Sequence, residues 1–352
     1  MLHQIAAFLP IAERILNRRH PDPLLQSICI ENSWMRMSDG EFFARMPLEE
    51  DRYYTLPVEL LKRVLKTRPN SLKVELLEKN LIRLHFGNQH ITFTAEDARN
   101  YPDIPNENFR AMGTWSKAAI LQLHRQLPFT AKHSPESFQN GVYIHQNKRL
   151  RSCATDGHIL QYVDDLDPVN ACRFQKDFLG ILPRKGIQLL CKFAKGNVKV
   201  AAGKTLLRYT LPGKVELYIP PLKDAYPDFL KIVNRELPHE IRLKKETLLN
   251  VMKAVSPLKA DVMLFNMKNG RIEIRAENRD TDVSFETEIL TLERRGKALQ
   301  IGFDPKLLET TLKAIEGDEV IWQYSAAHAQ SKFSGAGNNV NIIMPIQGVG
   351  KT

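Results

Sequence analysis

Three aspartates, Asp164, Asp165 and Asp167, lie close together near the middle of the chain. Clustered carboxylates are able to hold Mg²⁺ for phosphoryl-transfer chemistry, as they do in nucleases. The surrounding residues are typical of turns, and the stretch ends at Pro168. A solvated loop is therefore the preferred interpretation, and a magnesium-dependent enzyme is the alternative.

Two other patterns suggest chemistry but are incomplete. His158 follows Asp156 closely and can act as an acid or a base, yet no nucleophile with an orienting group accompanies the pair. The run Gly348–Thr352 imitates the end of a phosphate-binding loop, but that motif requires a glycine five residues before Gly350, where this chain has Pro345. Neither catalysis at His158 nor nucleotide binding is predicted.

The cysteines are spread along the chain without Cys-x-x-Cys spacing, at Cys29, Cys153, Cys172 and Cys191. Neither a zinc site nor a disulfide framework is signalled, so we expect reduced thiols, no metal and no cofactor. No run approaches the roughly 18 to 20 apolar residues of a membrane span, and the first residues do not have the pattern of a signal peptide. A cytoplasmic protein without membrane contact is expected.

The net charge points to one class of partner. The 352 residues include 50 Lys and Arg against 40 Asp and Glu, a formal net charge of +10. This surplus favours a polyanionic partner, although ordinary surface charge also produces such values. The placement of the charges on the predicted helices decides between these interpretations.

Six segments have the apolar periodicity of amphipathic helices. They are expected to begin near Pro10, Pro57, Ser116, Pro183, Lys245 and Pro305. Proline is tolerated in a first turn, and Ser116 and Asp304 are well placed as N-caps. In the fourth segment, the face opposite the apolar stripe contains bases but no acid; it consists of Lys185, Gln188, Lys192 and Lys195. One such face is ordinary, but six of them around a common space would attract the DNA backbone.

The chain contains a threefold repeat. Helix-patterned and strand-patterned stretches precede Tyr101-Pro102-Asp103 in the first copy and Tyr226-Pro227-Asp228 in the second, and the strand patterns cover 71–94, 197–220 and 319–346. A regular repeat indicates one supersecondary unit used three times, and repeats of roughly 115 residues match a common domain size. Each repeat is predicted to be an antiparallel sheet with two helices on one side, an α+β arrangement.

Several motifs then occur in a recognisable order. They are Asn140-Gly141, Ala154-Thr155-Asp156-Gly157-His158, Pro183-Arg184-Lys185-Gly186, Tyr226-Pro227-Asp228-Phe229 and Met344-Pro345-Ile346. In this order, inside a threefold repeat, they resemble the bacterial DNA sliding clamp, the β subunit of the replicative DNA polymerase III.

The resemblance implies a ring. Three repeated clamp-like domains, at 1–113, 114–238 and 239–352, would each pack two helices on antiparallel sheets and together form a half ring. Two chains would join head to tail as a homodimer, with helices lining a hole for double-stranded DNA. Such a protein is not an enzyme. Its partners, the replicative polymerase and the clamp loader, would bind through short linear peptides.

The resemblance also implies two sets of site residues. The residues expected to touch DNA, independently of its sequence, are Arg184 and Lys185 first, and then Arg18, Lys62, Lys117 and Arg125. The residues expected to form a pocket for partner peptides are Thr155, Gly157, His158, Leu160, Pro227, Lys231, Ile232, Met344, Pro345 and Ile346. An apolar cleft with a few polar groups at its border suits this second role.

The chain departs from the family pattern at several positions. Ile159 stands where the family usually has arginine, Gln139 where an apolar pocket residue is common, and Gln347–Thr352 extends past the usual end. These departures indicate a divergent clamp and leave its peptide preference open. The alternative function is a monomeric, magnesium-dependent DNA-processing or repair enzyme that uses the aspartate cluster and the basic helices.

Overall fold

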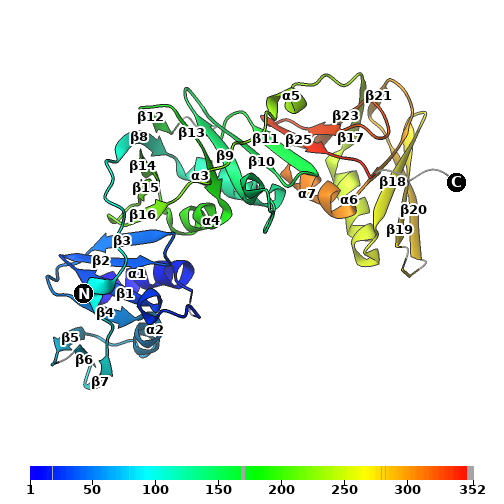
Figure 1. Ribbon diagram of the computed structural model, residues 1–352. Coiled ribbons are helices and arrows are strands. Elements are labelled where there is room, and N and C mark those ends of the chain that lie inside the picture. The colour runs from blue at the N-terminus through cyan, green and yellow to red at the C-terminus, as the bar shows by residue number, and fades with distance from the viewer. Residues whose placement is uncertain (18, 79, 168–170, 279, 282, 347–352) are drawn as a thin grey trace. The chain divides into compact units, whose positions relative to one another are not determined.

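The computed structural model describes residues 1–17, 19–78, 80–167, 171–278, 280–281 and 283–346 (Figure 1). The chain forms two compact units. Unit 1 comprises Met1–Leu121, Val169–Asp177 and Lys185–Pro221, and unit 2 comprises Gln122–Pro168, Phe178–Arg184 and Leu222–Thr352. Both contain helices packed on antiparallel sheets, so the predicted α+β class is confirmed.

Unit 1 contains two antiparallel sheets and two helices. The nine strands of its larger sheet are, in order, β12 (Arg173–Phe174), β8 (Arg110–Trp115), β14 (Val198–Ala202), β15 (Leu207–Thr210), β16 (Glu216–Ile219), β3 (Phe43–Pro47), β2 (Trp34–Ser38), β1 (Ser27–Glu31) and β4 (Tyr54–Pro57). The smaller sheet consists of β5 (Leu72–Leu76), β6 (Leu81–Phe86) and β7 (Gln89–Thr94). The helices that pack together are α1 (Leu2–Ile15) and α2 (Val58–Lys66), and the 3-10 turns are η1 (Pro23–Gln26) and η2 (Ala98–Asn100).

Unit 2 repeats this plan. The nine strands of its larger sheet are, in order, β13 (Phe178–Pro183), β9 (Gly141–Gln146), β10 (Leu150–Thr155), β11 (Ile159–Val163), β25 (Asn339–Ile343), β24 (Ser331–Ser334), β23 (Glu319–Tyr324), β17 (His239–Lys244) and β21 (Glu293–Arg295). Its smaller sheet consists of β20 (Val283–Leu290), β19 (Arg271–Asn278), β18 (Val262–Lys268) and β22 (Gln300–Phe303). Its helical segments are α5 (Leu230–Val233), α6 (Lys245–Val255), α7 (Pro305–Ala314), η3 (Leu127–Phe129), η4 (Ser137–Asn140) and η5 (Ser256–Leu258).

Two further helices, α3 (Lys117–Arg125) and α4 (Arg184–Phe193), contain residues of both units. Five of the six predicted helices begin where the sequence places them. Ser116 Oγ accepts the Ala119 N–H at 3.0 Å, and Asp304 Oδ1 accepts the Lys306 N–H at 2.7 Å, so both expected N-caps are confirmed. No helix in the described part of the chain is long and apolar enough to cross a membrane.

The prediction for the first helix was wrong. The helix does not begin near Pro10 but runs from Leu2 to Ile15 with Pro10 inside it. An interior proline normally disfavours a helix because it lacks an N–H and crowds the preceding turn. Here the residues before it, including Ile5 and Phe8, are fully buried, and burial of that apolar stripe outweighs the cost.

The strand predictions were more accurate, because alternation is strong in these segments. The runs predicted at Leu72–Leu76 and Leu81–Phe86 are β5 and β6, and β14 to β16 and β23 to β25 occupy the equivalent stretches. The proposed domain boundary before His239 coincides with the start of β17, whereas the one after Gly113 falls inside β8. The domain limits stay a prediction.

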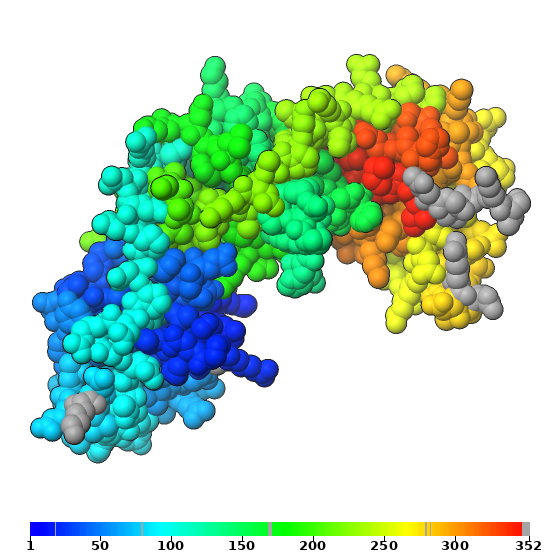
Figure 2. All heavy atoms as spheres, in the orientation of Figure 1, coloured from blue at the N-terminus to red at the C-terminus, as the bar shows by residue number. Residues whose placement is uncertain are grey.

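Each nine-stranded sheet joins strands that are distant in sequence. In unit 1, β16 pairs with β3, and Leu217 lies opposite Ala44. In unit 2, β25 pairs with β11, and Asn341 lies opposite Gln161. Figure 2 shows the second case, in which the red C-terminal segment lies against green strands from the middle of the chain. These two contacts are called the internal junctions below.

Candidate functional site

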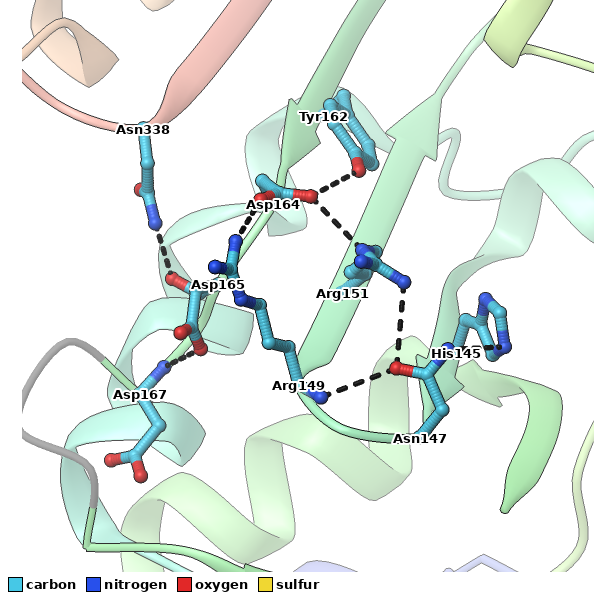
Figure 3. Close-up of polar contacts among 9 residues, drawn as sticks. All are labelled: His145, Asn147, Arg149, Arg151, Tyr162, Asp164, Asp165, Asp167 and Asn338. Atoms are coloured by element: carbon cyan, nitrogen blue, oxygen red, sulfur yellow. Dashed lines mark hydrogen bonds and ion pairs between the residues drawn. The ribbon is translucent and has the colours of Figure 1, made fainter.

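Asp164, the first aspartate of the cluster, is held by basic and phenolic groups (Figure 3). Its carboxylate accepts hydrogen bonds from Arg149 Nη1 at 2.8 Å, Arg151 Nε at 2.9 Å and the Tyr162 hydroxyl at 2.8 Å. Burial acts to raise the pKa of Asp164, but the hydrogen bonds from Tyr162 and the two arginines lower it overall. The charge of this carboxylate is therefore already compensated by the protein.

The other two aspartates shape the loop itself. Asp165 Oδ1 accepts the Asp167 N–H at 3.0 Å, and the Asp165 carbonyl accepts a hydrogen bond from Asn338 Nδ2 at 2.8 Å (Figure 3). No group of three His, Cys, Asp or Glu among the described residues is arranged to hold a metal ion. These contacts favour the loop interpretation over the magnesium site.

A tight turn joins β10 to β11. Asp156 Oδ1 accepts the N–H groups of His158 at 2.8 Å and Ile159 at 2.9 Å, and Gly157 adopts a φ of +94°, which glycine tolerates best. The His158 carbonyl accepts the Met344 N–H at 2.9 Å, so the turn is tied to the residue after β25. Asp156 and His158 thus build a loop, as the resemblance implies.

Beside this turn, one face of the unit 2 sheet carries an apolar cluster. Cys153, Leu160 and Ile342 come from three neighbouring strands, and Phe229 and Val233 cover them from the α5 segment. Leu160 lies opposite Ile342 in the β11–β25 pairing. Partly buried residues at the margin of the cluster are Tyr143, Tyr162, Tyr226 and Val340.

Three large apolar side chains remain exposed around this cluster. They are Leu230 (44% exposed), Ile232 (40%) and Met344 (42%). The α5 segment that carries two of them is fixed by Gln330, whose Nε2 donates to the Ile232 carbonyl at 3.1 Å. Exposed apolar residues that lie close together are candidates for a binding surface. The surface around Ile232, Leu160 and Met344, which the resemblance assigns to a peptide pocket, is called the cleft below.

A cavity of about 440 Å³ borders the apolar cluster at Phe229. It is lined by Tyr143, Tyr162, Tyr226, Arg151, Asp164 and Leu230, among others. Its lining differs from that of the cleft because it is aromatic and charged, and Asp164 and Arg151 are already paired with each other.

The other predicted pocket residues have varied positions. Thr155 is buried, and its Oγ1 donates to the Ile159 carbonyl at 2.7 Å. Pro227 lines the neighbouring cavity, while Lys231 extends into solvent with its side chain 84% exposed and pairs with Asp228 at 3.2 Å. Pro345 is buried, and the Ile346 N–H donates to the Gly302 carbonyl at 2.9 Å. These last two residues therefore anchor the chain after β25.

The two departures from the family pattern have different consequences. Ile159 is 2% exposed and lies opposite Ile343, so it contributes to packing and not to the cleft. Gln139 lies beside the turn, because its Nε2 is 3.3 Å from the place where a Cβ on Gly157 would sit. Its Oε1 accepts a hydrogen bond from Ser134 Oγ at 2.8 Å. The extension 347–352 lies outside the described residues.

The equivalent position in unit 1 is closed. There Tyr218 lies opposite Phe43, as Ile342 lies opposite Leu160 in unit 2. Phe43, Leu206 and Tyr218 form a buried cluster, and the Phe109 ring packs against Tyr218 with centroids 5.5 Å apart. The aromatic rings fill the space that remains accessible in unit 2.

The two residues expected first at DNA are engaged by the protein. Arg184 Nη1 donates to the carbonyls of Leu127 and Thr130 after α3, and burial lowers the pKa of Arg184. Lys185 is ion-paired with Asp39, and its Nζ also donates to the Ile15 carbonyl at 3.1 Å. Sequence periodicity places both on a helix face but does not reveal these long-range partners.

The other expected DNA residues differ in availability. Lys62 is paired with Glu13 at 2.8 Å, and Arg18 lies outside the described residues. Lys117 and Arg125 are exposed on α3 and make no ion pair within the described part of the chain. Other exposed bases on helices include Arg14, Arg63, Lys66, Lys192, Lys253 and Lys306, and Lys195 follows α4.

Sequence reasoning missed most of the floor of the cleft. Cys153, Val233 and Ile342 were not singled out, and the short helix α5 was not predicted. The apolar residues within β10 and β25 were the available signal, but they do not indicate which face of the sheet a distant segment covers.

Comparisons with known proteins agree with this architecture. No protein-family model matches the chain. It is 20% identical over 360 residues to the β sliding clamp of Pseudomonas putida, covering 96% of each protein, and 22% identical over 322 residues to that of Vibrio cholerae, covering 87% and 86%.

Solved clamp structures superpose on nearly the whole chain. The DNA polymerase sliding clamp of Bacillus subtilis has a TM-score of 0.87 at 19% identity, over 98% of this chain and 97% of that chain. A sliding clamp of Pseudomonas aeruginosa bound to griselimycin has a TM-score of 0.79 at 21% identity, over 97% of both. The chain therefore has the sliding-clamp fold over nearly its whole length and is similar in sequence to bacterial β sliding clamps.

Proposed function

We propose that this protein is a DNA sliding clamp, a non-catalytic processivity factor that encircles duplex DNA as a head-to-tail homodimeric ring. The observation that carries the proposal is the sliding-clamp fold over nearly the whole chain. It is combined with two sheet edges, β7 and β20, which correspond in the repeat to the strands that pair at the internal junctions. It would act in the cytoplasm, tethering the replicative polymerase to its template.

The internal junctions suggest how two chains join. In both, the last strand of one repeat pairs with the third strand of the preceding repeat: β16 with β3, and β25 with β11. The remaining strands of these two kinds are β7 and β20, and each is an edge of its sheet. We propose that β7 of one protomer pairs with β20 of its partner, once at each end of the two chains.

The register of this pairing follows from rows of residues that lie opposite one another on neighbouring strands. Each row below has an equivalent in the other repeats. In the last strands the rows are Val74–Leu84–Ile91, Val200–Tyr209–Leu217 and Trp322–Phe333–Asn341. In the third strands the rows are Tyr54–Ile30–Met35–Met46, Gly180–Ile144–Ser152–Val163 and Ile301–Phe265–Ile274–Thr287. The third-strand rows end at Met46 and Val163. Leu217 lies opposite Ala44, two residues before Met46, and Asn341 lies opposite Gln161, two residues before Val163. The remaining row ends at Thr287, so the same two-residue offset places Ile91 opposite the partner's Phe285.

Attraction to DNA comes from the exposed bases of the helices. A clamp needs only weak, sequence-independent contacts with phosphates, since closure of the ring supplies retention and tight contacts would prevent sliding. Lys117 and Arg125 meet this requirement because they are exposed and unpaired among the described residues. Lys185 and Arg184 are proposed as secondary contacts, since both are held by protein groups.

The cleft is the proposed site for partner peptides. Burying apolar anchors between Ile232, Leu160 and Met344 would contribute about 25 cal/mol per Å² removed from water. The polymerase and the clamp loader would compete for this site. Griselimycin, which is bound by the related clamp of Pseudomonas aeruginosa, is a suitable chemical probe for it.

Topological retention is the direct test of the function. The protein, loaded onto nicked circular DNA, is expected to stay bound at a salt concentration that abolishes electrostatic binding, and to be lost after the circle is linearised. Equal loss from circles and from linear DNA would reject the ring. Magnesium-dependent cleavage that disappears in Asp165→Ala would instead support the alternative, a DNA-processing enzyme.

Neutralising the free bases of α3 should weaken the electrostatic encounter with DNA. In a Lys117→Gln, Arg125→Gln variant, the slope of log affinity against log salt should fall by about 2 per chain, since each phosphate contact contributes roughly one unit. The measurement is fluorescence anisotropy with a labelled duplex over a salt series. A variant with the same charge loss away from these helices, Arg99→Gln with Lys199→Gln, should keep the wild-type slope. Equal slopes in both variants would remove α3 from the DNA surface.

A further inference from the structure

The proposed junction between protomers has one charged pair at its centre. The proposed register places Ile91 opposite the partner's Phe285. In the adjacent pair it places His90 opposite the partner's Glu286. At the equivalent place in the β16–β3 junction, Glu216 lies opposite Arg45, and the two are ion-paired at 2.6 Å. In the β16–β3 junction the basic residue lies on the third strand, β3, whereas in the proposed junction it lies on the last strand, β7. The acidic and basic residues have therefore exchanged strands.

The second internal junction has no charge at this place. There Tyr162 lies opposite Val340. Neither internal junction has a histidine at this place, and the only group there that changes charge near neutral pH is His90 at the proposed junction.

We infer that closure of the ring is controlled by protonation of His90, which faces the partner's Glu286 when the two protomers join, and that the ring is tighter in mild acid than in mild base. The inference rests on the proposed clamp function, because it concerns the contact that completes the ring.

The groups around His90 on its own sheet are mostly basic. His85 lies opposite His90 on β6 with ring centroids 5.8 Å apart, and its Nε2 is 2.9 Å from Glu75 Oε2 on β5. Arg83 is paired with the same Glu75 at 3.3 Å, and Lys73 lies opposite His85. Glu75 is the acid that these bases share. A protonated His90 therefore has no carboxylate of its own among the described residues of the sheet.

The partner strand is mostly acidic on the corresponding face. Glu286 is 67% exposed and reaches Arg275 Nε at 3.4 Å, but Arg275 is more closely paired with Glu277 at 2.5 Å. The next acid on the same face, Glu288, is paired with Arg271 at 3.3 Å. On β19 that face also carries Glu273, which pairs with Lys268. Glu286 therefore keeps capacity for a cation from another chain.

The direction of the pH dependence follows from linkage. A carboxylate beside His90 favours the charged imidazole, so the joined protomers bind more protons than the separate ones, and association strengthens as the pH falls through the range in which histidine titrates. An exposed cross-strand pair changes an equilibrium by roughly two- to fivefold. Because a closed ring has two identical junctions, we expect a change of about 4- to 25-fold in the dimer dissociation constant.

The experiment is sedimentation equilibrium of the full chain at about pH 6 and about pH 8. The wild type should show a dissociation constant lower at the acid value by the factor above, and His90→Gln should remove most of that difference. His124→Gln, which removes another exposed histidine on α3, should keep it. In a His90→Asp, Glu286→Arg variant, which copies the polarity of Arg45 and Glu216, dimers should persist without the pH dependence.

The outcomes separate this inference from the function on which it rests. A dimer whose dissociation constant does not vary between the two pH values, or a pH dependence that survives in His90→Gln, overturns the inference and leaves the clamp intact. A wild type that stays monomeric at both pH values overturns the homodimeric ring itself.

Discussion

Replacing Ile91 with glutamate will dissociate the proposed dimer. The wild-type chain of 40.3 kDa should sediment at about twice its mass, and the Ile91→Glu variant at its own mass. The new carboxylate would lie in the apolar row opposite the partner's Phe285, and burying an unpaired charge costs several kcal/mol at each junction. With two junctions in a ring, the dissociation constant should rise by at least about 1000-fold. Analytical ultracentrifugation measures this directly.

The other edge of the same sheet provides the control. Leu76 on β5 is 40% exposed, so Leu76→Glu adds the same charge to an edge that the proposal leaves free, and this variant should remain dimeric. Far-UV circular dichroism of both variants checks that the sheet is intact. A dimer that persists in Ile91→Glu but is lost in Leu76→Glu would place the junction on β5.

Local patterns in the sequence were sufficient for most of the secondary structure. Leu72–Leu76 alternates between apolar and polar residues, and Leu81–Phe86 does so from Ile82 onward, so both runs were predicted with the limits of β5 and β6. Asp304 and Ser116 are short polar residues directly before apolar stripes, which is why the starts of α7 and α3 were predictable. Pro10 misled the prediction because the start signal of a proline was weighed without the buried residues that precede it.

Long-range pairing could not be predicted in this way. Lys185 and Asp39 are ion-paired although they are far apart in the sequence, and Arg184 serves the carbonyls of Leu127 and Thr130. Lys185 lies on the predicted outer face of a helix, where periodicity treats it as free, and Arg184 was predicted from the resemblance alone. Whether a base faces DNA or a neighbouring loop depends on tertiary contacts, so neither residue is a clean probe of DNA binding.

The cleft shows a similar division. The resemblance gives Leu160, Ile232 and Met344 as members of one predicted set, and their role in peptide binding stays a prediction. The reason that only unit 2 has such a cleft depends on side-chain volume at equivalent positions. Tyr218 with Phe109 fills the unit 1 site, whereas Ile342 leaves its counterpart accessible. The same strand pairing therefore carries a buried aromatic cluster in unit 1 and an apolar cluster flanked by exposed side chains in unit 2.

Polar substitutions in the cleft should abolish peptide binding without unfolding the chain. Ile232 and Met344 are 40% and 42% exposed, so Ile232→Ser with Met344→Ser removes apolar contact area for a ligand at little cost to the fold. Each large apolar contact is worth about 1.5 to 3 kcal/mol when fully buried, so the pair should weaken binding by at least about 100-fold. The measurement is fluorescence anisotropy with a labelled short linear peptide that carries large apolar anchors.

Leu230→Ser is the matched control for this experiment. Leu230 is 44% exposed on the same short helix, but it lines the aromatic and charged cavity instead of the cleft. Because the contact area lost in that variant lies outside the proposed path of the peptide, affinity should stay within about twofold of the wild type. Strong loss in Leu230→Ser with normal binding in the double variant would move the peptide site to the neighbouring cavity, where the three tyrosines rather than Leu160 and Ile342 would receive the anchors.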